Sequence, residues 1–213
     1  MKTEELMDML SADVTAVKRH ALTRTIGVAI AMGSVLAIGG ALAALGIRGD
    51  LADSTALAYM LAKLAFALTI VAVASIYLTR LARPGGENRT NALVIAAPFA
   101  AIVLLAAINL LLAPSSHWDK MIVGNDWLEC ILSIPIIAIL PFAVTMWAVR
   151  KAAPTDLVRA GTFAGLVAGG ISALGYALHC TDDSLPFVAV WYGGTIALCT
   201  LAGAMLGPRL LRW

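Results

Sequence analysis

The stretch that decides the fold is residues 92–113, ALVIAAPFAAIVLLAAINLLLA, which contains no charged residue. A helix needs about 20 consecutive, mainly apolar residues to cross the hydrocarbon core of a bilayer. Further stretches qualify in the same way, and we expect them at residues 25–47, 56–78, 128–149, 160–178 and 185–206. The sequence therefore predicts an all-α polytopic membrane protein whose residues 25–213 form a six-transmembrane-helix bundle.

The composition of the chain indicates that lipid is its main solvent. Of its 213 residues, 61% are hydrophobic and 13% are charged, whereas a soluble domain has about 25% charged residues. The net charge of +2 gives no reason to expect direct binding of nucleic acid. Because turn residues separate the apolar stretches and the loops are short, we expect no soluble domain between the spans.

The basic residues are distributed unevenly between the two sides of the predicted bundle. The two terminal tails and the second and fourth loops hold 12 of the 15 lysines and arginines, while the other loops hold only Arg48 and Lys120. Lys63 falls within the second span, and its long side chain is expected to reach back to the outer interface. Since the cytoplasmic side carries the excess of Lys and Arg, we predict a bacterial inner-membrane protein with both termini in the cytoplasm.

Small residues and prolines mark particular positions in the predicted helices. Gly161, Gly165 and Gly169 recur every four residues in the fifth span, a spacing that lets two helices approach closely in lipid. The expected use of this stripe is packing within the chain, and the alternative is a seam between two copies in a homodimer. Pro135 and Pro141 predict a kink or local unwinding of the fourth span.

The predicted spans lack the groups that membrane enzymes and pumps use. No Asp, Glu or Arg lies at the middle of a span, and no Ser/His, HExxH or DxxD arrangement occurs in one. Buried ionisable residues are the usual mark of ion pathways and proton relays in membrane proteins. We therefore expect no enzymatic activity, and a proton-coupled transporter or ion pump has few residues with which to work.

Two cysteines fall at the outer face of the predicted bundle. Cys130 begins the fourth span and Cys180 directly follows the fifth, in the stretch HCTDD at 179–183. This topology places both thiols in an oxidising compartment. They can pair as a disulfide or hold a transient soft metal ion such as zinc or cadmium, or they can simply pack as unpaired cysteines. The candidate metal ligands are Cys130, His179, Cys180, Asp182 and Asp183, and no permanent cofactor is expected.

Residues 1–24 predict an amphipathic cytoplasmic helix before the first span. Leu6, Leu10, Val14 and Val17 recur at spacings of four, four and three and so form one apolar stripe. Such a helix can lie on membrane lipid or dock in the groove of a partner protein. The acidic residues at its start favour the partner, because anionic headgroups repel them.

Several short motifs along the chain form a recognisable set. They are the segment L-x3-L-x2-D-V-x2-V from Leu6 to Val17, Cys130 with Ser133 and Pro135, RKAAP at 150–154, HCTDD at 179–183, Phe187, Trp191 and the closing RLLRW at 209–213. This set resembles the NrsF family, negative regulators of an extracytoplasmic-function (ECF) sigma factor, over essentially the whole chain. One departure is Tyr192, where Trp191 is expected to precede a histidine.

The resemblance implies a membrane-bound anti-sigma factor. Such a protein would hold its ECF sigma factor at the cytoplasmic face and release it when Cys130 and Cys180 meet an oxidant or a heavy metal. The residues expected to contact the sigma factor are Leu6, Leu10, Asp13, Val14 and Val17. The alternative is a small transporter or a membrane thiol oxidoreductase. A transporter needs facing polar residues near the midplane and a thiol oxidoreductase usually needs a CxxC-type pair, and the sequence shows neither.

Overall fold

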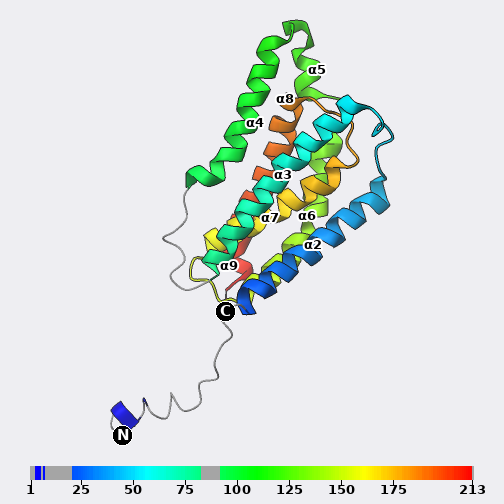
Figure 1. Ribbon diagram of the computed structural model, residues 1–213. Helices are drawn as coiled ribbons and strands as arrows, with labels where there is room; N and C mark the ends of the chain where they lie inside the picture. The colour runs from blue at the N-terminus through cyan, green and yellow to red at the C-terminus, as the bar shows by residue number, and fades with distance from the viewer. Residues whose placement is uncertain (1–2, 6, 8–20, 83–91, 213) are drawn as a thin grey trace.

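The computed structural model describes residues 3–5, 7, 21–82 and 92–212 and shows a helical bundle (Figure 1). Its described elements are all helices, with no strand among them. They are α2 (Ala21–Leu45), α3 (Ser54–Leu81), α4 (Ala92–Leu112), the 3-10 helix η2 (Ser115–His117), α5 (Trp118–Val123), α6 (Trp127–Arg150), α7 (Leu157–Ala177), α8 (Leu185–Phe187), the π-helix η3 (Val188–Tyr192) and α9 (Gly193–Leu210).

Among the described residues, six helical segments are long and apolar enough to cross a membrane, which confirms the predicted all-α fold with six spans. The first segment is α2 and the last joins α8, η3 and α9 into one run, Leu185–Leu210. Several helices extend beyond the predicted apolar stretches. One reason is capping by polar residues outside those stretches, since the Asp53 side chain accepts a hydrogen bond from the backbone N–H of Thr55 at the start of α3.

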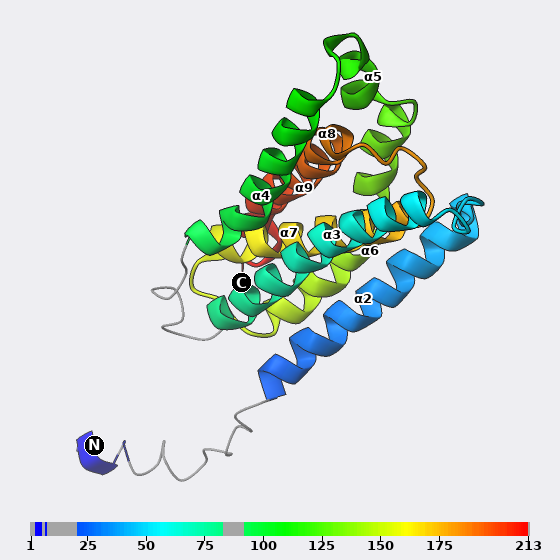
Figure 2. The same ribbon diagram turned by 45° about the horizontal axis from the view of Figure 1, so that its top comes forward.

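Helix α7 forms the centre of the bundle and contacts α2, α3, α6 and α9 (Figures 1 and 2). In the most apolar 18-residue stretch of α7, 72% of the residues are buried. The corresponding fraction is 11% in α4, which lies at the side of the bundle. In lipid, helices approach closely where their side chains are small. The close approach of α7 to its neighbours therefore depends on small residues.

The glycine stripe of α7 provides this close approach. A Cβ atom added to Gly161 would lie 2.2 Å from the carbonyl oxygen of Gly203, and one added to Gly165 would lie 2.3 Å from that of Cys199, both in α9. The stripe is therefore the seam between α7 and α9 of one chain. It is not exposed for contact with a second copy.

The fourth span does not unwind at its prolines, and the alternative of a kink stays a prediction. Helix α6 continues without interruption through Pro135 and Pro141. A neighbouring helix supports this region, because a Cβ atom on Gly33 of α2 would lie 3.1 Å from the Cα atom of Pro141. Proline is tolerated in membrane helices that other helices cover. The departure from α geometry lies in the sixth span instead, at the π-helix η3.

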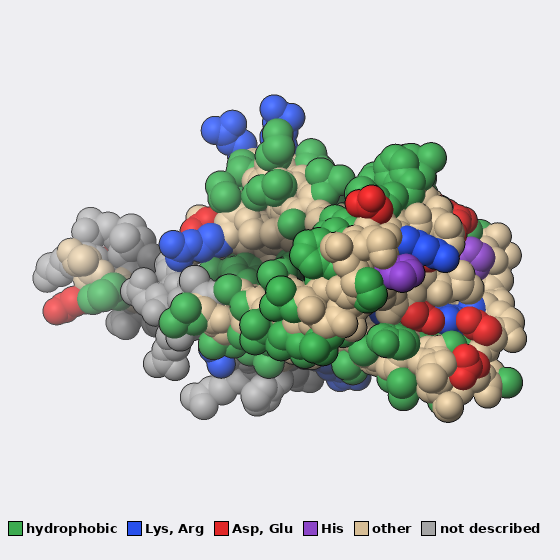
Figure 3. All heavy atoms as spheres, turned by 90° about the horizontal axis from the view of Figure 1, so that it is seen from above, with side chains coloured by type: hydrophobic (Ala, Val, Ile, Leu, Met, Phe, Trp, Pro, Cys, Tyr) green, Lys and Arg blue, Asp and Glu red, His purple; other side chains and the backbone are tan. Residues whose placement is uncertain are grey.

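The two ends of the bundle differ in charge. Helix α2 begins near Arg24 and helix α9 ends near Arg209, so both basic residues lie at one end of the bundle. The other end holds the connections 46–53, 113–126 and 178–184, and acidic and histidine side chains gather over it (Figure 3). The residues predicted to contact a partner lie outside the described residues: Leu6, Leu10, Asp13, Val14 and Val17.

Candidate functional site

Cys130 lies in the first turn of α6 and points into the core. Its backbone N–H donates to the carbonyl oxygen of Asp126 at 2.9 Å, and its side chain has 0% exposure. Buried residues follow it with helical spacing, first Ile134 and then Ala138. Cys130 is therefore fixed on the face of α6 that packs into the bundle, away from lipid.

Cys180 lies in the connection between α7 and α8, at the same end of the bundle. Its backbone N–H donates to the carbonyl oxygen of Tyr176 at 3.0 Å, which extends the last turn of α7, and its residue exposure is 1%. Both Cys130 and Cys180 carry free thiols and belong to one continuous core cluster. The fold thus places two thiols that are 50 positions apart in the sequence in one core cluster at the same end of the bundle.

Hydrogen bonds fasten the Cys180 connection to the beginning of α6. The carboxylate of Asp182 accepts from the backbone N–H groups of Asn125 and Asp126, each at 2.7 Å. The Ser184 hydroxyl donates to the carbonyl oxygen of Met121. These bonds tie the segment after α7 to the segment before α6.

A buried cluster of charges lies directly beside Cys180. The Asp183 carboxylate forms ion pairs with Arg48 at 2.6 Å and with Lys63 at 2.8 Å. Arg48 forms a second ion pair with Asp50 at 2.6 Å. The side chains of Arg48 and Lys63 are 0% and 1% exposed. The carbonyl oxygen of Cys180 accepts hydrogen bonds from both cations, each at 3.1 Å. The cluster thus joins the α2–α3 connection, α3 and the α7–α8 connection.

The Lys63 side chain extends toward the thiol end of the bundle, but its ammonium group is buried there against the connection after α7 and is not exposed. The ammonium group turns inward because Asp183 and the Cys180 carbonyl satisfy it inside the bundle. It also lies 3.8 Å from the Cys180 sulfur and 5.8 Å from the centre of the Tyr192 ring. The residue is therefore a buried cation next to a thiol.

The charges at this end influence one another. Burial opposes ionisation of Asp183, but hydrogen bonds from Arg48 and Lys63 hold its pKa below the usual value. The hydrogen bond to Asp183 raises the pKa of Arg48 in turn. Burial raises the pKa of the Cys180 thiol, and the nearby Lys63 acts in the opposite direction. At rest, Cys180 is therefore a neutral thiol held next to a positive charge.

The residues predicted as metal ligands make separate contacts. Asp183 binds Arg48 and Lys63, Asp182 binds backbone N–H groups, and the His179 ring nitrogen lies 3.8 Å from a Glu129 oxygen. Across residues 21–82 and 92–212, no three His, Cys, Asp or Glu side chains gather closely enough to hold a metal ion. The metal site stays a prediction, and what the fold assembles is a thiol pair with a cation.

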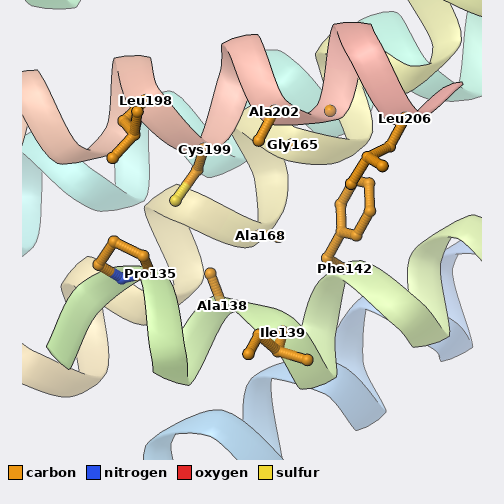
Figure 4. Close-up of a pocket in the computed structure, with 11 residues that line it drawn as sticks. Pro135, Ala138, Ile139, Phe142, Gly165, Ala168, Leu198, Cys199, Ala202 and Leu206 are labelled. Carbon is orange, nitrogen blue, oxygen red and sulfur yellow. The ribbon is translucent and has the colours of Figure 1, made fainter. Parts of the chain in front are cut away.

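The third cysteine has a different environment. Cys199 of α9 faces an apolar cavity of about 260 Å³ between α6, α7 and α9 (Figure 4). The lining includes Pro135, Phe142 and Leu206, and it contains no charged residue. Cys199 thus behaves as the small apolar residue that its position in the middle of a span predicts.

Sequence reasoning missed the roles of Arg48 and Asp183. Arg48 was interpreted only as a basic residue of an outer loop, and Asp183 only as a candidate metal ligand. The two residues are separated by 135 positions, so no local pattern links them. The available signal was Lys63, because a lysine within a span needs an acidic partner when its side chain stays inside the bundle.

Comparison with known proteins shows the family of the chain. Residues 10–213 match the NrsF family, described as "Negative regulator of sigma F". The chain belongs to the NrsF family. It is 31% identical over 213 residues to the probable anti-sigma-F factor NrsF of Azospira oryzae, and 29% identical over 214 residues to the anti-sigma-F factor NrsF of Caulobacter vibrioides. Each match covers 100% of both chains. No solved structure matches this chain.

Proposed function

We propose that this NrsF-family protein is an anti-sigma factor of the bacterial inner membrane that holds an ECF sigma factor at its cytoplasmic face. The observation that carries the proposal is the family match over residues 10–213, which spans the whole bundle. The uneven distribution of lysine and arginine supports an orientation with both termini in the cytoplasm. In this orientation the thiol end of the bundle faces the outside.

Residues 1–24 are the part of the protein that we propose for capture of the sigma factor. Their apolar residues Leu6, Leu10, Val14 and Val17 form one stripe, and Asp13 lies beside it. An amphipathic helix of this kind docks its apolar face in a hydrophobic groove. The loops and tail that carry basic residues at the same end, including Arg150 and Arg209, add positive charge around the docking segment.

Cys130 and Cys180 are the part that we propose for sensing an oxidant or a soft metal ion. The arrangement that supports this role is two buried free thiols in one core cluster, on segments joined through Asp182. A disulfide between them, or a metal held by both sulfurs, would fix the start of α6 to the end of α7. A hundredfold change in sigma-factor affinity would require about 2.7 kcal/mol of difference between the two states, which one disulfide can supply.

Helix α7 provides the connection between the two ends. It begins at Leu157 beside the basic loop and ends at Ala177 next to Cys180. Its seam with α9 leaves no room for a Cβ atom at Gly161 or at Gly203. Because interiors packed in this way move as units rather than deform gradually, a displacement of the thiol end of α7 reaches its cytoplasmic end.

The capture role is tested by binding of the sigma factor to the full chain in membranes. Replacing Leu6 and Leu10 by Asp should abolish capture and leave membrane insertion intact, because the charges destroy the apolar stripe. Replacing Glu4 and Glu5 by Gln, on the same segment but outside the stripe, is the matched control and should leave capture in place. Undiminished capture by the Asp variant would show that the partner binds elsewhere.

A further inference from the structure

The two thiols of the sensing pair have different surroundings. The Cys180 sulfur lies 3.8 Å from the ammonium nitrogen of Lys63, and its residue belongs to a connection between helices. Cys130 lies within α6, and the packing around it includes Ile134 of its own helix and other members of the apolar core cluster. A cation next to a sulfur stabilises the thiolate, which is the form that attacks an oxidant. The fold therefore distinguishes the two cysteines chemically.

The balance of buried charge strengthens this distinction. Arg48 and Lys63 are both fully buried cations, while Asp183 is the partly buried carboxylate between them, with 18% exposure of its side chain. Asp50 is the second acid that pairs with Arg48. Its side chain is 45% exposed, so solvent screens its charge. Two buried cations thus face one partly buried carboxylate, and the Cys180 sulfur lies 3.8 Å from one of these cations, Lys63.

From this geometry we propose that Cys180 is the thiol that reacts first with a hydroperoxide, that Cys130 is the resolving thiol, and that Lys63 is the positioning residue that activates Cys180. The inference rests on the proposed sensing function, since it assigns separate roles to the two cysteines of that pair. It adds a specific residue, Lys63, to which neither the family match nor the names of the relatives assign a role.

The proposed chemistry has two balanced steps. In the first step the Cys180 thiolate attacks one oxygen of the hydroperoxide and the O–O bond breaks. The sulfur becomes a sulfenic acid, and the other oxygen leaves as hydroxide or alkoxide, which takes up the proton that the resting Cys180 thiol gave up to form the thiolate. In the second step the Cys130 sulfur attacks the Cys180 sulfenic sulfur and the S–O bond breaks. A disulfide forms, and the leaving hydroxide and the proton lost by Cys130 form water. Sulfur loses two electrons in total, and the peroxide gains them.

The first experiment compares the two thiols in the full-length protein in membranes. Cys130→Ser leaves Cys180 as the candidate thiol, and Cys180→Ser leaves Cys130. Each variant is treated with hydrogen peroxide in the presence of a dione that traps sulfenic acids, and labelling of each cysteine is measured by mass spectrometry. We expect Cys180 to be labelled at least about tenfold faster than Cys130, the factor that about 1.4 kcal/mol of barrier produces. Cys199, in its apolar cavity, reports any general loss of structure.

The second experiment tests Lys63 in the Cys130→Ser background. Lys63→Met keeps most of the side-chain length and removes the charge, so it should slow labelling of Cys180 by about tenfold. Lys63→Arg restores a cation and should recover most of the rate, which a role only in packing would not produce. Lys120→Met, on a lysine in the short helix α5 at the same end of the bundle, is the matched control and should leave the rate unchanged.

The outcomes separate this inference from the proposed function. Labelling of Cys130 as fast as Cys180 would overturn the assignment of roles. An unchanged Cys180 rate in Lys63→Met, or the same slow rate in Lys63→Arg, would overturn the role of Lys63. Both experiments measure covalent labelling without a sigma factor, so they give their answer whether or not oxidation releases one. Failure of the proposed function would appear instead as release of the sigma factor that is independent of both cysteines.

Discussion

Lys63 of α3 and Asp183 of the α7–α8 connection form an ion pair of 2.8 Å inside the bundle. Arg48 binds the other oxygen of the same carboxylate at 2.6 Å. The single carboxylate therefore holds two buried cations from different segments of the chain. Ion pairs of this kind are sensitive to the loss of either partner, because the remaining charge is left without compensation.

Replacing Asp183 by Asn should destabilise the protein strongly. The substitution keeps the size of the side chain but leaves Arg48 and Lys63 without their shared anion, and loss of one partner of a buried pair costs about 3–5 kcal/mol. Thermal unfolding in detergent, followed by circular dichroism, measures the effect. Asp119→Asn, in the first turn of α5 at the same end, is the control and should change the unfolding temperature little. Equal unfolding temperatures for the two variants would contradict the role of the cluster.

The ion pair also predicts how stability depends on pH. The pKa of Asp183 is lowered in the folded protein, so the folded state binds the proton of this group less readily than the unfolded state. Its contribution is complete above the unfolded value of about 3.9 and is lost as pH falls through the lower folded value. Unfolding temperatures measured from about pH 5 down to about pH 2 should fall in the wild type. The Asp183→Asn variant should lack this component, and a parallel fall in both proteins would show that other acids cause it.

The seam between α7 and α9 should not accept even one methyl group. A Cβ atom on Gly203 would lie 2.3 Å from the carbonyl oxygen of Gly161, so Gly203→Ala must force the helices apart. Overpacking of this kind costs about 1–3 kcal/mol. In Gly40→Ala, on α2, the new Cβ atom would have no neighbour within 4 Å, and this variant should be neutral or slightly stabilising. Unfolding temperatures of the two variants provide the comparison, and a neutral Gly203→Ala would refute the seam.

The sequence predicted the six spans because each is a long apolar stretch, and apolar length alone determines whether a helix can cross a membrane. It also placed Cys130 and Cys180 at one end of the bundle, since alternating spans determine which loops share a side. The charged cluster could not be predicted in this way. Its partners Arg48, Lys63 and Asp183 meet only through tertiary packing. The π-helix at 188–192 was missed for a related reason, because a π turn has the same apolar composition as the α-helix around it.

The proposed orientation can be tested with reporter fusions. The excess of Lys and Arg at one end of the bundle predicts that end to be cytoplasmic. Alkaline phosphatase, which is active only outside the cytoplasm, should be active when fused after Pro114 and inactive when fused after Pro154. The reverse pattern would place the thiols in the reducing cytoplasm and remove the basis of the sensing proposal.

The central claim is that the thiol pair at one end of the bundle controls capture of a sigma factor at the other. The most direct test is the fraction of sigma factor that stays on membranes containing the full chain before and after addition of hydrogen peroxide. For the wild type we predict release on oxidation and recapture after addition of a reducing agent. Cys130→Ser and Cys180→Ser should each retain the sigma factor throughout, while Cys199→Ser should behave as the wild type. Retention by the oxidised wild type, or equal release from all four proteins, would contradict the account.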